Sequence, residues 1–313
     1  MSDLHSRYGI LEAGDIRILP VLHGKLEYAD LVRRAVAELT PSAVAVELAD
    51  TLREPVLAAV RRLPQVTVLL YEDDEGHSVY LPIEPADPLV EGLRSALERG
   101  LPAELVDLDL DYALRHAEAF PDTYSVVRIG AGAYLDAYLA ASADRAVDEL
   151  DRRRERGIAH RVQRLAARHG SVLLVCGMAH AQRIAADLAT AQAAPFARKR
   201  RDAVGLFHLH PRSLPETMTT FPLLASVYER RRCGLPAEPD EARMAPPRRR
   251  AVGDHLALVD GRREEVPDER AGLSAAVDWI ARRCGAPDSA FDRRQVHLKM
   301  LDRATLRYRA RTG

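Results

Sequence analysis

The sequence predicts an α/β protein with a mixed, mostly parallel central sheet flanked by helices, a helical insertion and a small C-terminal appendage. Two observations lead to this prediction. Short apolar runs, each long enough for one buried strand, alternate with amphipathic segments of helical period. Strands that alternate with helices pair in parallel, because each helix returns the chain to the edge where the next strand begins.

The order of elements follows from this rhythm. Apolar runs that begin at Ile18 and Leu173 lead into His23 and His180, and further strands are predicted at 43–47, 67–71, 105–109 and 204–210. Amphipathic helices are predicted at 27–39, 51–63 and 88–98. The segment 76–83 contains a Gly and a Pro, which favours an edge strand or a hairpin partner of 67–71. Residues 131–169 have a helical composition and are expected to form the insertion, split near Gly157.

The chain divides by composition after Cys233. We expect an α/β domain over 1–233, a linker rich in Pro and Arg over 234–252, and a small appendage of unreadable role over 253–313.

Charge and composition exclude several classes of protein. With 45 Lys and Arg against 46 Asp and Glu the net charge is −1, so no global attraction to nucleic acid or to a membrane surface is expected. No signal peptide and no apolar run of spanning length is visible, which predicts a soluble cytoplasmic protein. The 3 cysteines are far apart, which argues against a disulfide framework or a thiolate zinc site.

Most of the predicted strands end in a histidine or a carboxylate. Since the carboxyl ends of parallel strands meet at one edge of the sheet, these side chains are expected along a single rim. They are His23, Glu47, Asp107, Asp109, His180, His208 and His210. His208 and His210 alternate across one strand, so at most one of them is expected in the site. A lone strand-end histidine is more often structural, but the coincidence of several favours function.

The same residues resemble the TraB/Tiki superfamily, which includes pheromone-shutdown proteins, Tiki metallopeptidases, erythromycin esterases and ChaN-like haem-binding lipoproteins. The resemblance covers roughly residues 15–190. It rests on Val46-Glu47-Leu48 after a first βαβ unit and on the GxxH element that runs from Gly177 to His180. Weaker similarities are Asp107-Leu108-Asp109, and Arg154-Glu155 followed by Ile158-Ala159. Pro20 departs from the family pattern, which has a glycine before the first histidine.

Two histidines and one glutamate suit Zn²⁺, Mn²⁺, Co²⁺ or Fe²⁺ and leave positions open for water and substrate. The leading hypothesis is therefore a metal-dependent hydrolase of a peptide, amide or ester bond, with His23, Glu47 and His180 as metal ligands. Its substrate would be a small molecule or a peptide. Asp107 or Asp109 would act as outer-sphere group or base, and Arg154 would stabilise an oxyanion. Glu27 is a fallback ligand, although a glutamate there more often stabilises a helix N-terminus.

Three alternatives stay open. The resemblance to erythromycin esterases implies a metal-free hydrolase in which His23 is the general base and Glu47 its partner. The haem-binding branch implies a cofactor carrier, but the chain lacks a lipoprotein signal and only 5% of it is aromatic, so haem is disfavoured. A scaffold that has lost catalysis would bind a partner through the linker or the C-terminal tail.

Overall fold

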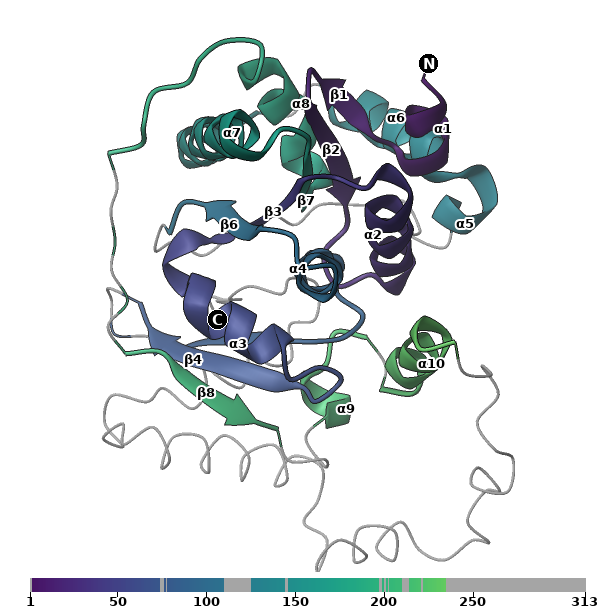
Figure 1. Cartoon of the computed structure of the whole chain (residues 1–313), viewed down its shortest axis with the longest axis vertical. Helices are drawn as coiled ribbons and strands as arrows, with labels where there is room; N and C mark the ends of the chain where they lie inside the picture. The colour runs from purple at the N-terminus through teal and green to yellow at the C-terminus, as the bar shows by residue number, and fades with distance from the viewer. Residues whose placement is uncertain are drawn as a thin grey trace, which may run out of the picture.

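The fold is an α/β layer structure built around a five-stranded sheet (Figure 1). The computed structural model describes residues 2–234 except 74–75, 77, 110–124, 144–145, 197–198, 200, 202, 210–213 and 221. The linker and the appendage predicted beyond Gly234, and with them Trp279, lie outside the described residues. Within the described part, no helix is both long and apolar enough to cross a membrane.

The central sheet has the order β1-β2-β7-β3-β6, and only β1 runs antiparallel to its neighbour. Its strands are β1 (Leu11–Ala13), β2 (Ile16–Val21), β3 (Ala43–Ala49), β6 (Ala103–Asp107) and β7 (Val172–Gly177). This confirms the mixed, mostly parallel sheet. The short β1 was not predicted, since three residues carry too little periodicity to stand out.

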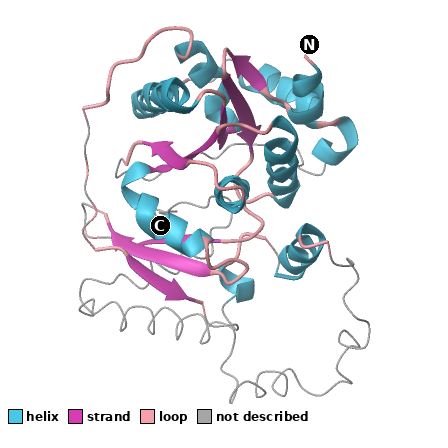
Figure 2. Cartoon of the chain, viewed as in Figure 1, coloured by secondary structure: helices cyan, strands magenta, loops and turns pink. Residues whose placement is uncertain are grey.

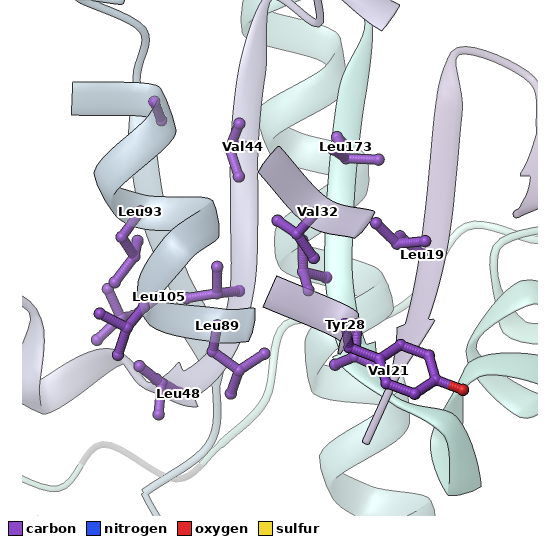
Figure 3. Packing of buried hydrophobic residues seen from close by; sticks show 14 of the residues in the cluster. Leu19, Val21, Tyr28, Val32, Val44, Leu48, Leu89, Leu93, Leu105 and Leu173 are labelled. Atoms are coloured by element: carbon purple, nitrogen blue, oxygen red, sulfur yellow. The ribbon is translucent and has the colours of Figure 1, made fainter. Parts of the chain in front are cut away.

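Helices cover both faces of this sheet, and the alternation of side chains along each strand decides which residue meets which helix. Leu19, Val44 and Leu173 belong to the core under α2 (Leu26–Leu39) and α4 (Pro88–Glu98), as Figure 3 shows. Their neighbours Ile18, Ala43 and Leu174 belong to a second core under α7 (Glu149–His169) and α8 (Met178–Asp187). Because both faces are buried, the strands read as continuous apolar runs.

A second, three-stranded sheet of order β5-β4-β8 is antiparallel throughout (Figure 2). Its strands are β4 (Thr67–Glu72), β5 (Ser78–Ile83) and β8 (Gly205–His208). The hairpin pairing of β5 with β4 is confirmed. Placing 67–71 and 204–210 in the parallel sheet was wrong, because a short apolar run has the same pattern in a parallel and an antiparallel buried strand.

The remaining helices are α1 (Asp3–Tyr8), the 3₁₀ turn η1 (Asp50–Leu52), α3 (Arg53–Val60), α5 (Ser125–Ile129), α6 (Ala131–Ser142), α9 (Leu214–Thr217) and α10 (Pro222–Arg232). Of these helices, only α3 and α6 lie in predicted helical segments, whereas α1, α5, α9 and α10 were not predicted. The helical insertion between β6 and β7 comprises α5, α6 and α7. Its predicted break near Gly157 was wrong, since α7 is continuous there and Gly157 instead allows close approach to Leu108.

Buried ion pairs attach α10 to α4. Arg232 binds Glu91 at 3.0 Å, and Arg94 binds Glu229 with both of its terminal nitrogens. Glu91 is fully buried and also accepts a hydrogen bond from Ser95. These contacts fix the C-terminal end of α10 against α4.

Candidate functional site

Three neighbouring parallel strands bring the leading candidates to one edge of the central sheet. Val21 at the end of β2 pairs with Gly177 at the end of β7, and β7 in turn pairs with β3 as far as Val46. His23 follows β2, His180 lies in the first turn of α8 after β7, and Glu47 lies near the end of β3. The predicted gathering of these three residues at one rim is therefore observed.

Glu47 is buried at the centre of this rim. It shares the sheet face of Ala43 and Ala45, so its side chain points toward α7. The pairing of β3 with β6 shifts register between Val46 and Ala49, an irregularity that re-aims a side chain at a strand end. One carboxylate oxygen accepts from the Gly177 amide at 2.5 Å and the other from Arg154 at 2.7 Å. Both oxygens of Glu47 are thus held in place.

Arg154 of α7 connects the buried carboxylates of the site. Its side chain is only 3% exposed and contacts three buried carboxylates. It donates to Glu47 and Asp107 at 2.7 Å each and to Asp151 at 3.0 Å. The expectation that Arg154 would stabilise an oxyanion is not supported, because its hydrogen bonds are directed at carboxylates inside the protein. Its role here is to position Glu47.

His180 is oriented by a second carboxylate on α7. Its Nδ1 lies 2.9 Å from Glu155, and its Nε2 faces Arg154 at 3.5 Å and Glu47 at 3.8 Å. Because a carboxylate only accepts, Nδ1 is the ring nitrogen that donates to Glu155. Burial alone would raise the pKa of Glu155, but hydrogen bonds from His180 and Arg183 hold that pKa below its ordinary value. Glu155 is therefore an ionised acceptor that sets the ring orientation of His180.

His23 is the site residue that reaches solvent. Its side chain is 25% exposed, against 7% for His180 and 1% for Glu47, and its Nε2 lies 3.9 Å from Glu47. Gly177 makes this packing possible: a Cβ there would lie 2.8 Å from His23 Nε2 and 3.1 Å from the Glu47 carboxylate. Any side chain at 177 would push the imidazole away from Glu47.

The turn that carries His23 is held from the opposite side by residues that the sequence did not reveal. The Gly24 amide donates to the buried carboxylate of Asp87 at 3.0 Å, and Asp87 also caps α4 through Leu89 and Val90. Gly24 adopts a φ of +66°, and a Cβ there would lie 2.3 Å from Thr219 Cγ2. The only local signal was Asp87-Pro88, a helix start, which gives no hint of the contact 63 residues away.

Glu84 fixes the loop that packs on Gly24. It accepts from the amides of Thr219 at 2.8 Å and Thr220 at 3.3 Å. Burial raises the pKa of Glu84 to about 7 in spite of these hydrogen bonds. Thr219 and Thr220 are thereby tied to the segment between β5 and α4, whose Asp87 binds Gly24.

Other predicted candidates lie elsewhere. Asp109 sits beyond β6, where its carboxylate binds Arg201 at 2.7 Å and accepts from Thr51, so Asp107 rather than Asp109 joins the cluster. His208 ends β8 in the second sheet, where it contacts Arg62. The prediction that His208 would lie on the common rim was therefore wrong. Glu27 lies in the first turn of α2, the position that suits the helix dipole. His210 is outside the described residues.

The donor atoms of the predicted metal centre lie farther apart than the ligands of one tetrahedral ion, and the metal ion stays a prediction. Ligands about 2 Å from a tetrahedral ion lie about 3.3 Å apart, whereas the imidazole–carboxylate separations here are 3.9 and 3.8 Å. Both oxygens of Glu47 already accept hydrogen bonds, one of them from a cation. Among the described residues, no group of three or more His, Cys, Asp or Glu side chains is arranged to hold a metal.

Comparison with known proteins adds no assignment: no family model, no curated protein and no solved structure matches the chain. The resemblance to the TraB/Tiki superfamily therefore stays a prediction.

Proposed function

We propose that the chain is a hydrolase of an ester, amide or peptide bond in which His23 activates water with Glu47 as its partner. The observation that carries this proposal is the pairing of one partly exposed imidazole with a buried carboxylate whose two oxygens are both fixed. A general base must reach solvent and substrate, and among the three candidates only His23 is more than a tenth exposed.

The role of each residue follows from how far its side chain is buried. His23 takes the proton of the attacking water, and the negative charge of Glu47 favours the imidazolium that forms. Arg154 and the Gly177 amide keep Glu47 from turning toward solvent. His180, whose ring is oriented by Glu155, lies on the buried side of the His23–Glu47 pair. The proposed mechanism uses only groups of the chain itself. Arg154 supplies the cation that compensates the charge of Glu47.

The test is hydrolysis by the full-length chain of a panel of p-nitrophenyl esters, anilides and fluorogenic peptides, before and after exhaustive chelation. We expect activity that survives chelation and is lost in His23→Ala. Gly177→Ala should lose it as well, since its Cβ displaces the imidazole. His169→Ala is the matched control: this half-buried histidine ends α7, beside the start of β7 at the opposite edge of the sheet.

The outcomes separate the competing hypotheses. Activity abolished by chelation and restored by Zn²⁺, Mn²⁺, Co²⁺ or Fe²⁺ would favour the metal-dependent hydrolase and contradict the metal-free proposal. Full activity in His23→Ala would show that His23 is not the general base. A wild-type protein inactive on the whole panel would favour a scaffold, and a Soret band on adding hemin would favour the haem-binding alternative.

A further inference from the structure

A second concave site lies where α7 meets the edge of the central sheet at β6. A cavity of about 550 Å³ opens between α7, the outer edge of β6 and the residues Ala194, Pro195 and Lys199. In the described part of the chain, β6 is the edge strand of the central sheet. Arg161, at one end of the cavity, lies two helical turns, or about 10 Å, along α7 from Arg154.

The carboxylates that line this cavity are each neutralised by an arginine. The pairs are Asp50 with Arg161 at 2.6 Å, Glu104 with Arg53 at 2.9 Å, and Asp109 with Arg201 at 2.7 Å. Each carboxylate that lines the cavity among the described residues is therefore compensated by a cation.

Positive charge remains after this pairing. Arg164 and Arg168 line the cavity from exposed positions one turn apart on α7, and neither contacts a carboxylate among the described residues. Among the described residues, the lining carries four cationic side chains, Arg161, Arg164, Arg168 and Lys199, against three carboxylates, in a chain of net charge −1. Two of those carboxylates, Glu104 and Asp109, are paired with Arg53 and Arg201, which lie outside the lining. Such a concave cationic site concentrates anions.

The edge strand is closed to an added strand. Arg161 donates to the carbonyl of Val106 at 3.3 Å, and Arg53 reaches that of Ala103 at 3.5 Å. Guanidinium groups thus cover backbone acceptors that an incoming β-strand would need. This arrangement disfavours an extended peptide as the occupant.

Apolar side chains form part of the remaining lining, which consists of Leu105, Val106, Leu165, Ala194 and Pro195 together with Thr51 and His160. The volume lies in the range of small-molecule pockets, about 300–1,000 Å³. Two guanidinium groups one helical turn apart suit the oxygens of a phosphate, and the apolar walls suit an organic group attached to it. We propose that this cavity binds a small organic phosphate, independently of the His23 site.

The test is isothermal titration calorimetry of the full-length chain at fixed ionic strength with phenyl phosphate, inorganic phosphate and benzyl alcohol. Phenyl phosphate should bind at one site, more tightly than inorganic phosphate, and benzyl alcohol should not bind. The double variant Arg164→Gln/Arg168→Gln should weaken phenyl phosphate by about tenfold or more, since it removes two charge-assisted contacts.

The control variant is Arg153→Gln/Arg156→Gln, which removes the same charge from exposed positions of the same helix that do not line the cavity. It should bind phenyl phosphate as the wild type does, and so should His23→Ala. No saturable binding of phenyl phosphate, or an equal loss in both double variants, would overturn the site. Inorganic phosphate bound as tightly as phenyl phosphate would overturn the organic ligand.

Discussion

Replacing Arg154 with methionine should be the most destabilising single change at the candidate site. The side chain is 3% exposed and is surrounded by Glu47, Asp107 and Asp151, whose side chains are 1%, 3% and 6% exposed. Methionine fills a similar length but leaves three buried carboxylates without their cation. Removing one partner of a buried ion pair costs about 3–5 kcal/mol, a large part of the 5–15 kcal/mol that stabilises a typical domain.

The measurement is urea-induced unfolding of the full-length chain, followed by far-UV circular dichroism. Arg153→Met is the control, because Arg153 is exposed on the preceding position of α7 and its replacement should change the free energy of unfolding by about 0.5 kcal/mol or less. Adding Asp107→Asn to Arg154→Met should recover part of the loss, since one uncompensated charge disappears. A loss of less than about 1 kcal/mol in the free energy of unfolding for Arg154→Met, or no recovery in the double variant, would refute the proposal that Arg154 compensates the three carboxylates.

Two further predictions concern the support of the His23 turn. Asp87→Asn should keep the α4 cap but present an amide NH₂ toward the Gly24 N–H, which leaves that buried donor unsatisfied at a cost of about 1–3 kcal/mol. Faster Gly24 amide exchange and a shifted His23 ring resonance are the NMR signatures, and Asp148→Asn, at the exposed cap of α7, should leave both unchanged. For Glu84, burial raises the pKa from 4.5 to about 7, so the folded state holds the proton more tightly than the unfolded state. The free energy of unfolding should therefore fall by about 3 kcal/mol as pH rises through this window, and Glu84→Gln should remove that share of the slope in urea titrations at pH 5 and pH 8.

The strand-end residues show how far a pattern in the sequence reaches. Apolar runs that alternate with amphipathic helices imply parallel strands, and parallel strands in one sheet present their carboxyl ends at one edge. This argument placed His23, Glu47 and His180 together without any knowledge of contacts. It failed for His208, because β8 has the composition of a buried strand but belongs to the antiparallel sheet with β4 and β5. The sequence of a four-residue strand such as β8 does not indicate which sheet the strand will join.

The sequence by itself determined the α/β class, the parallel core and the rim where His23, Glu47 and His180 meet, because these follow from local periodicity and chain direction. Only the tertiary structure decided that Arg154 binds three carboxylates, that Asp107 and not Asp109 joins the site, and that Asp87 holds Gly24. Those contacts link groups that lie 47, 63 and 107 positions apart in the chain. Their partners depend on how helices pack on the sheet, and periodicity within one element carries no information about that packing.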